Sequence, residues 1–217
     1  MRVVVVASGE LEPEDGRWLD RADLLIAADG GAASLDRLGR RPDVLVGDLD
    51  SADAALVERL MDAGTRVERH DHDKEASDTE LALEAAIAAG ATEVLLLGAL
   101  GGERVDHELA NLLLLADPAL AGRDVRLIRG PIAVRALRTG TSVALGGGPG
   151  DLVTLLPVGG DAAGVTTRGL RWALDGATLR LGRSRGLSNE IVSQPASVSL
   201  EQGTLLVVET AIEGSTT

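Results

Sequence analysis

The sequence predicts an α/β protein, with an N-terminal three-layer α/β domain that has a mostly parallel sheet and a C-terminal antiparallel β-sandwich domain. In residues 1–130, short aliphatic runs alternate with stretches of helical period, which is typical of strands joined by crossover helices. In residues 131–217 the helical period is lost, and glycine-rich turns separate short apolar stretches. The charge changes too: residues 1–120 hold 26 acidic and 11 basic side chains, whereas residues 121–217 hold 8 and 10.

The composition limits the class of protein. The chain has 217 residues, a formal net charge of −13 and 45% hydrophobic residues, and it lacks Cys, Phe and Tyr. The acidic balance argues against a nucleic-acid partner, and the lack of Cys excludes disulfides and thiolate metal sites. No apolar run approaches the roughly 18 residues of a membrane span, and Val3–Val6 is too short for a signal peptide. We therefore expect a cytoplasmic protein without a membrane partner.

The predicted elements of the first domain alternate strictly. The strands are apolar runs rich in Val and Leu, with the expected bounds Val3–Val6, Leu24–Ala28, Val44–Val46, Val67–Arg69, Val94–Leu97 and Val125–Ile128. The helices between them are expected at Asp15–Asp20, Ala32–Leu38, Ala52–Asp62, Asp78–Ala89 and Asp106–Ala116. Right-handed crossovers then make the sheet parallel, and ligands of such sheets bind outside the carboxyl ends of the strands.

The most informative motif follows the strand Val44–Val46 and reads Gly-Asp-Leu-Asp-Ser from Gly47 to Ser51. In an extended segment Asp48 and Asp50 point the same way, and two carboxylates on one side repel each other unless a cation lies between them. Mg²⁺, with phosphate oxygens completing its shell, fits this position. The alternative is that Asp50 and Ser51 only cap the next helix.

Two further aspartates point to the same edge of the sheet. Asp29 ends the second strand and precedes Gly30 and Gly31, which let the backbone approach a ligand closely and start a helix whose N–H groups favour anions. Asp78 begins the fourth helix, where Ser77-Asp78-Thr79-Glu80 is also a capping-box pattern. We expect Asp29, Asp48, Asp50 and Asp78 to converge as an acidic cup for Mg²⁺.

Cationic and glycine-rich features accompany this cup. Lys74 is the only lysine among 21 cationic side chains, which favours point contact with a phosphate or carboxylate. The turn Gly98–Gly102 leads into a helix, as in a phosphate cradle, although its spacing fits neither the P-loop nor the dinucleotide fingerprint. Arg104 is a candidate phosphate clamp or a surface ion pair, and Asp106 a candidate helix cap. The alternation of histidine and aspartate over residues 70–73 resembles metal ligands, but a solvated loop is the favoured interpretation.

The second domain is predicted to consist of short strands. Their expected bounds are Ala133–Leu137, Ser142–Leu145, Leu152–Leu156, Leu179–Leu181, Ala196–Leu200 and Leu205–Val208, and Glu213–Thr217 is expected to be a frayed tail. Trp172 offers a flat face for a heteroaromatic ring, and Ser188 and Asn189 offer donors and acceptors for an aminopyrimidine edge. The alternative places Trp172 in the core and makes Ser188-Asn189-Glu190 a turn.

Taken together, these motifs resemble the thiamine pyrophosphokinase family over both domains. The resemblance rests on their order and spacing: Asp29-Gly30-Gly31, Pro42-Asp43 through Ser51, Lys74 to Asp78, Gly98 to Gly102, Arg104-Val105-Asp106-His107 with Asn111, Gly169-Leu170-x-Trp172-x-Leu174, and Ser188-Asn189-Glu190. It implies an α/β catalytic domain, a thiamine-binding β-sandwich, and a homodimer whose sites lie between the catalytic domain of one subunit and the sandwich of the other.

The resemblance also implies roles for single residues. Asp29, Asp48, Asp50 and Asp78 would hold Mg²⁺ and thus the phosphates of the co-substrate ATP, while Arg104 and Asp106 would help to place the transferred group. Trp172 would stack on thiamine, and Ser188 and Asn189 would hold its aminopyrimidine. The remaining candidates for nucleotide contacts are Gly30, Gly31, Lys74, Ser77, Gly101, Gly102 and Asn111. The chain departs from the family pattern at Glu75, where the family usually has aspartate, and at Glu103, an added residue.

The implied reaction converts ATP and thiamine to AMP and thiamine diphosphate. Two alternatives stay open at this point: diphosphate transfer to a hydroxymethyl-pterin by a related catalytic domain, and a nucleotide- or thiamine-binding protein without turnover. The second domain with Trp172 argues against the pterin, and the clustered aspartates argue against a binder, which has no need for so much acid around a polyphosphate.

Overall fold

The computed structural model describes residues 1–49, 53–71, 75–102 and 104–212. Its residue contacts divide the chain into two units, Met1–Gly130 and Pro131–Thr217, and each unit is described by itself below. In the part of the chain that is described, no helix combines the length and the apolar character that a membrane span needs.

The first unit is built on a parallel sheet with the strand order β6-β5-β1-β2-β3-β4. Its strands are β1 (Arg2–Val6), β2 (Leu24–Ala28), β3 (Val44–Gly47), β4 (Arg66–Arg69), β5 (Glu93–Leu97) and β6 (Asp124–Arg129). Its helices are α1 (Gly16–Leu19), α2 (Gly31–Arg37), α3 (Ala54–Asp62), α4 (Asp78–Ala88) and α5 (Val105–Leu114), with 3₁₀ turns at Pro13–Asp15 and Pro118–Leu120.

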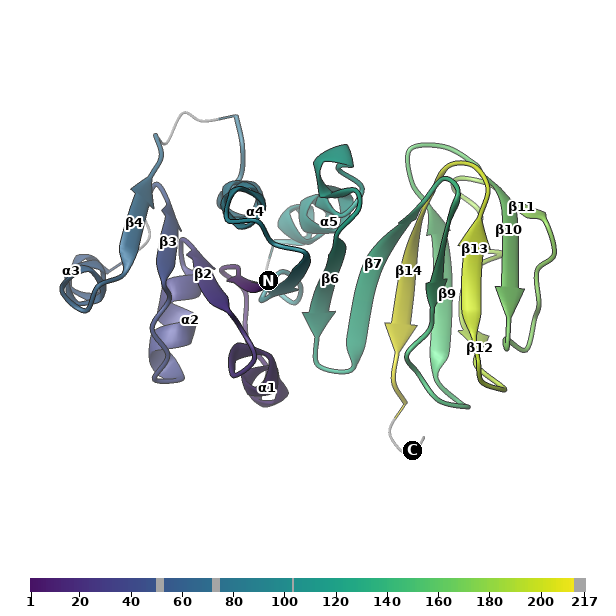
Figure 1. Ribbon diagram of the computed structural model, residues 1–217, viewed down its shortest axis with the longest axis horizontal. Coiled ribbons are helices and arrows are strands. Elements are labelled where there is room, and N and C mark those ends of the chain that lie inside the picture. Colours follow the sequence, from purple (N-terminus) through teal and green to yellow (C-terminus); the bar gives the residue numbers. More distant parts are fainter. Residues whose placement is uncertain (50–52, 72–74, 103, 213–217) are drawn as a thin grey trace. The chain divides into compact units, whose positions relative to one another are not determined.

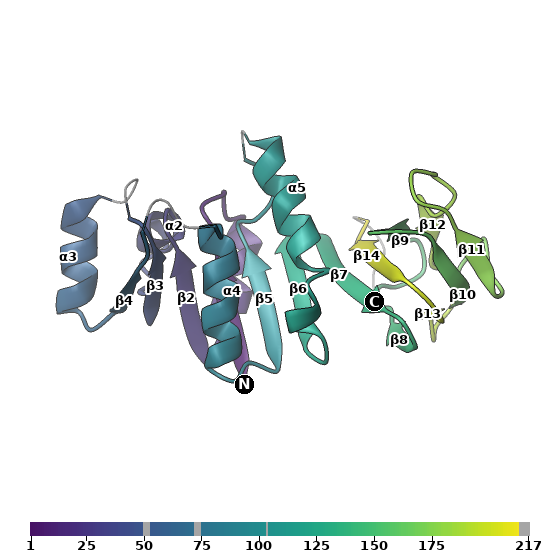
Figure 2. The ribbon, with the colours of Figure 1, turned by 90° about the horizontal axis from the view of Figure 1, so that it is seen from above.

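Helices cover both faces of this sheet, which makes the unit three-layered (Figures 1 and 2). On one face, Leu19 of α1, Leu35 of α2 and Leu60 of α3 belong to a cluster of buried apolar side chains that also contains Val4 and Leu45. On the other face, α4 contacts β1, β2 and β3. Because the central strands are covered on both faces, their sequences are continuous apolar runs rather than alternating ones.

The second unit is an antiparallel β-sandwich. Among its described residues, β12-β9-β14-β7 and β11-β10-β13-β8 form the two sheets. The strands are β7 (Ile132–Arg138), β8 (Thr141–Ala144), β9 (Leu152–Pro157), β10 (Ala162–Arg168), β11 (Ala177–Leu179), β12 (Asn189–Glu190), β13 (Ser197–Leu200) and β14 (Thr204–Thr210). One core joins both sheets, with Val153 and Val207 from the first and Val165 and Val198 from the second. The predicted fold class is therefore confirmed.

The structure differs from the local predictions at a helix start and at one strand, each for a physical reason. Helix α3 begins at Ala54 with Asp53 as its N-cap, whose side chain accepts from the N–H of Ala55 at 3.0 Å, so the proposed cap by Asp50 and Ser51 is not the one used. Strand β10 was missed because Gly164, at φ 68°, interrupts its alternation where the pairing with β11 shifts register. The expected frayed tail Glu213–Thr217 lies outside the described residues.

Candidate functional site

Two of the predicted acidic residues meet at Gly47, where β3 ends. The backbone N–H of Asp29 donates to the carbonyl of Val46 at 2.8 Å, which carries the end of β2 alongside the end of β3. A Cβ atom on Gly47 would lie 3.2 Å from Cβ of Asp29 and 3.2 Å from Oδ1 of Asp78. With φ at 151°, Gly47 also has a backbone conformation that suits glycine. The missing side chain at Gly47 therefore leaves room for both Asp29 and Asp78 at this point.

The segment after Gly47 is not extended, which corrects the expected geometry of the motif. Asp48 follows directly and is half-buried. Leu49 has φ 62° and is only 8% exposed, because its side chain belongs to the apolar cluster that also contains Leu35 and Leu60. A non-glycine residue in the left-handed region is rare and strained, and such strain is concentrated at functional sites. Strand alternation consequently does not continue through Leu49, and Asp50 lies outside the described residues.

The donor chemistry at this edge fits a hard divalent cation. Within residues 1–49, 53–71, 75–102 and 104–212, no three His, Cys, Asp or Glu side chains are arranged as a complete metal site. Mg²⁺ in nucleotide sites, however, takes one or two carboxylates and fills its shell with phosphate oxygens and water. Asp29, which is 9% exposed, with Asp78 and the adjoining Asp48, provides carboxylates of this kind.

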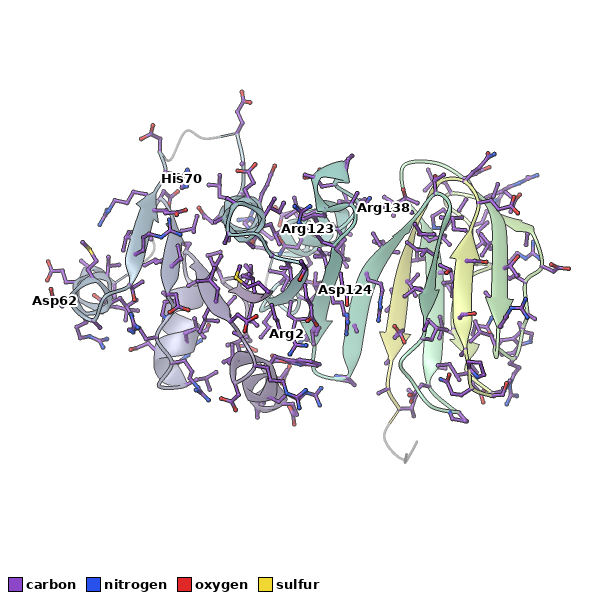
Figure 3. The ribbon with its side chains drawn as sticks, in the orientation of Figure 1. Arg2, Asp62, His70, Arg123, Asp124 and Arg138 are labelled. Atoms are coloured by element: carbon purple, nitrogen blue, oxygen red, sulfur yellow. The ribbon has the colours of Figure 1, made fainter. Side chains whose placement is uncertain are left out.

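Of the histidine–aspartate segment after β4, the structure describes His70 and Asp71. His70, labelled in Figure 3, donates its backbone N–H to the carbonyl of Gly47 at 3.1 Å. Residues 72–74, which include the predicted phosphate contact Lys74, lie outside the described part of the chain.

A pocket of about 510 Å³ opens at this edge of the sheet. Its walls come from the segments after β1, β2 and β5, from the start of α4 and from the first two turns of α5. The residues are Ala7, Ser8, Gly9, Asp29, Ser77, Asp78, Thr79, Gly98, Ala99, Leu100, Gly102, Arg104, His107, Glu108, Ala110 and Asn111. This volume is within the range of small-molecule sites. Six predicted residues contribute to it: Asp29, Ser77, Asp78, Gly102, Arg104 and Asn111.

The predicted glycine cradle already holds an acidic side chain. Oε1 of Glu108, in the second turn of α5, accepts from the backbone N–H of Gly101 at 2.9 Å and of Gly102 at 3.0 Å. Nδ2 of Asn111 donates to the carbonyl of Ala99 at 2.9 Å and so binds the same loop to α5. In this state a carboxylate of the chain occupies the place where a phosphate oxygen was expected.

Loss of the Glu108 carboxylate should loosen this loop. We expect Glu108→Ala to lower the free energy of unfolding by about 1–2 kcal/mol, because two hydrogen bonds to a charged acceptor are lost. Glu108→Gln keeps an acceptor oxygen and should lose less than half of that. Urea unfolding at constant m value measures both, and Glu84→Ala on the exposed side of α4 is the matched control. Equal stabilities of Glu108→Ala and the control would show that the carboxylate does not hold the loop.

Arg104 and Asp106 form an exposed ion pair at the start of α5. Their atoms Nη2 and Oδ2 lie 2.6 Å apart, and Nε donates to Oδ1 at 2.9 Å. The hydrogen bonds from Arg104 lower the pKa of Asp106 to about 2. Both groups are therefore charged at neutral pH, and Arg104 is the N-cap residue of α5, so Asp106 does not cap its helix as the alternative had it.

The Gly30-Gly31 pair contributes to packing at this edge. A Cβ atom on Gly31 would clash with the carbonyl oxygen of Val6, and one on Gly30 would lie 3.2 Å from the Ser8 side chain. Close approach of α2 to β1 is thus sufficient to explain glycine at position 31.

Ser77 is the N-cap of α4, and its side chain accepts from the N–H of Glu80 at 3.2 Å.

The second unit has its own pocket, of about 540 Å³. All three residues predicted to bind substrate line it; the full lining is Leu155, Trp172, Ala173, Leu174, Arg185, Gly186, Leu187, Ser188 and Asn189. Trp172 is 59% exposed, so the alternative that it belongs to the core is wrong. Asn189 and Glu190 form β12 and pair with β9, so the alternative of a turn is correct for Ser188 but wrong for these two residues.

Ser188, which lines this pocket, is held in an unusual conformation. Its φ is 53°, and its backbone N–H donates to Oγ1 of Thr154 at 2.9 Å. Sequence reasoning missed Thr154, and it missed Arg185 and Glu108 in the two pockets as well. A sequence signal existed for Arg185, because three arginines lie between residues 180 and 185, next to the Ser-Asn motif. No such signal existed for Thr154, which contacts a segment far away in sequence, or for Glu108, which contacts the backbone of a loop.

Comparisons with known proteins agree with this arrangement. A family model described as thiamin pyrophosphokinase, catalytic domain, matches residues 16–127, and one described as thiamin pyrophosphokinase, vitamin B1 binding domain, matches residues 142–205. Thiamine pyrophosphokinase 3 of Oryza sativa subsp. japonica is 27% identical over 88% of this chain and 79% of its own length. Thiamine pyrophosphokinase of Bacillus subtilis (strain 168) is 25% identical over 94% and 96%. The crystal structure of thiamin pyrophosphokinase from Geobacillus thermodenitrificans has a TM-score of 0.82 and 26% identity, with 100% of both chains covered. The chain belongs to the thiamine pyrophosphokinase family.

Proposed function

We propose that the chain is a thiamine diphosphokinase, which transfers the diphosphate group of ATP to the hydroxyethyl arm of thiamine. The observation that carries the proposal is that each unit has a pocket with the chemistry of one substrate. Carboxylates meet at a helix start in the first unit, and an exposed indole lies beside polar groups in the second. Membership of the family supports the pairing of these two substrates.

The α/β unit would bind ATP as its magnesium complex. Asp29, Asp48, Asp50 and Asp78 would hold Mg²⁺, which when bound neutralises the polyphosphate and fixes its oxygens. Arg104 lines the pocket and would contact the transferred group, with Asp106 keeping its guanidinium in one orientation through two hydrogen bonds. The Glu108 carboxylate makes the Gly101–Gly102 side of the pocket the less favourable one for phosphate, since like charges repel there.

The β-sandwich would bind thiamine. The face of Trp172 would stack on the aminopyrimidine, and the Ser188 hydroxyl would bond to its polar edge. In the reaction, the thiamine hydroxyl oxygen attacks the β-phosphorus of ATP. The bond from this phosphorus to the α–β bridging oxygen breaks, AMP leaves with that oxygen, and the hydroxyl proton is released. Such a transfer depends mainly on positioning and on charge neutralisation.

A purified-protein assay tests the function. With Mg-ATP and thiamine we expect equimolar AMP and thiamine diphosphate, and no AMP when a hydroxymethyl-pterin replaces thiamine. AMP release with the pterin alone would favour the pterin diphosphokinase. Binding of both substrates without AMP would favour a sensor. A cytoplasmic location stays a prediction, which fits a reaction that consumes ATP.

We also propose that the protein is a homodimer whose sites combine the α/β unit of one subunit with the sandwich of the other. Exposed Val105, Leu109 and Leu113 recur at helical spacing along α5, which supports a covered face. Mixing Asp78→Asn with Trp172→Ala subunits tests the arrangement. Half of the dimers would be mixed, each with one intact site, so about a quarter of the wild-type activity should return at low thiamine concentration. No gain on mixing would contradict shared sites.

A further inference from the structure

The side chain of Asn189 is engaged with the main chain of Trp172. Oδ1 accepts from the backbone N–H of Trp172 at 3.0 Å and from that of Glu190 at 2.9 Å. Nδ2 donates to the carbonyl oxygen of Trp172 at 2.8 Å. We propose that Asn189 is a positioning residue that fixes the main chain of Trp172, and through it the indole, rather than a group that reads the ligand.

A count of hydrogen-bonding capacity supports this assignment. An asparagine amide has two N–H donors and two acceptor lone pairs. Both lone pairs and one donor are used by backbone, and the residue is 8% exposed, so little capacity is left for a ligand. Trp172 shows the opposite pattern, because the residue is 59% exposed while both polar groups of its main chain are bonded to one buried amide.

The neighbouring residues extend the same anchor. The backbone N–H of Arg171 donates to the carbonyl of Glu190 at 2.9 Å, and their side chains form an ion pair at 2.9 Å. Leu170 and Ile191 form an isolated antiparallel bridge. The segment with Trp172 is thus fastened along β12, with Asn189 as the only side chain among these contacts that holds Trp172 on both its N–H and its C=O.

An anchored indole binds a flat ligand at a lower entropic cost than a mobile one. Asn189 should therefore raise affinity for every ligand that stacks on Trp172, whatever the ligand's polar edge. Discrimination at that edge then falls to other groups, of which the Ser188 hydroxyl is adjacent. The inference deepens the proposed function and rests on it where substrate is concerned.

Intrinsic fluorescence can test the anchor without any ligand. The chain has two Trp residues and no Tyr or Phe, so Trp18→Phe leaves Trp172 as the sole emitter. In this background Asn189→Ala should lower the fluorescence anisotropy of Trp172. The matched control is Gln194→Ala, which also removes a side-chain amide bonded to backbone in the same unit, but away from the pocket. This readout is independent of turnover and holds even if the substrate assignment fails.

Kinetics then separate positioning from reading. Asn189→Ala should raise the thiamine KM roughly tenfold with the ATP KM unchanged, as the loss of two bonds to Trp172 predicts. The KM for oxythiamine, a thiamine analogue with a carbonyl in place of the pyrimidine amino group, should rise by the same factor. If Asn189→Ala does not fold, Asn189→Asp serves instead, because it keeps both acceptor bonds and makes only the contact with the Trp172 carbonyl repulsive. Unchanged anisotropy, or a loss confined to thiamine, would overturn the proposal.

Discussion

Replacement of Asp78 by asparagine is expected to reduce the turnover of Mg-ATP with thiamine by at least about a hundredfold, the range found when one preorganised charge-stabilising group is removed. Oδ1 of Asp78 lies 3.2 Å from the point that a Cβ atom on Gly47 would occupy, and Cβ of Asp29 lies at the same distance from that point. Asparagine has nearly the same shape but lacks the negative charge that would hold Mg²⁺. Steady-state AMP release over a range of Mg²⁺ concentrations measures the loss.

The matched control for this variant is Glu80→Gln. Glu80 lies in the same first turn of α4, so both variants remove one acidic charge from the helix N-terminus, which costs about 0.3–1 kcal/mol of stability in each. Glu80 faces a different, small cavity of about 40 Å³ and should keep normal turnover. Near-normal activity of Asp78→Asn, with thermal stabilities of the two variants equal, would remove the metal argument for this edge.

Much of the fold could be predicted from the sequence because buried strands have a recognisable pattern of apolar residues. The residues Val3–Val6 are fully buried under helices on both faces, and the run of four valines has few other structural explanations. Strand β12 could not be predicted in this way, since it is two residues long and exists only through its pairing with β9. Strand β10 was hidden by Gly164, which breaks the alternation that marks a half-buried strand.

The candidate site could be predicted to the extent that it follows from topology. Parallel strands end at one edge of a sheet, and this rule predicts that Asp29 lies near the aspartates of the motif that follows β3. Contacts between side chain and backbone followed no such rule. An amide such as that of Asn189 suits a pyrimidine and a peptide group equally well, and the carboxylate of Glu108 suits a loop N–H as well as a metal. Residue type alone does not distinguish the two partners.

Truncation of Trp172 should separate binding from folding. Because Trp172 is 59% exposed, Trp172→Ala should leave the free energy of unfolding within about 0.5 kcal/mol of the wild type. Stacking of a base on an aromatic side chain contributes about 1–3 kcal/mol, so the thiamine KM should rise about tenfold to a hundredfold while the ATP KM stays the same. Trp172→Phe keeps a smaller ring, and its thiamine KM should lie between those of the wild type and Trp172→Ala.

The control for Trp172→Ala is Leu181→Ala, which truncates another exposed apolar side chain of the sandwich outside the pocket. It should leave both KM values unchanged. A lower thermal stability of Trp172→Ala with an unchanged thiamine KM would give the indole a structural role after all. A rise in the thiamine KM at unchanged stability would instead give the indole a role in binding. An exposed aromatic surface is unfavourable in water, and a ligand that covers it would explain why the chain has it.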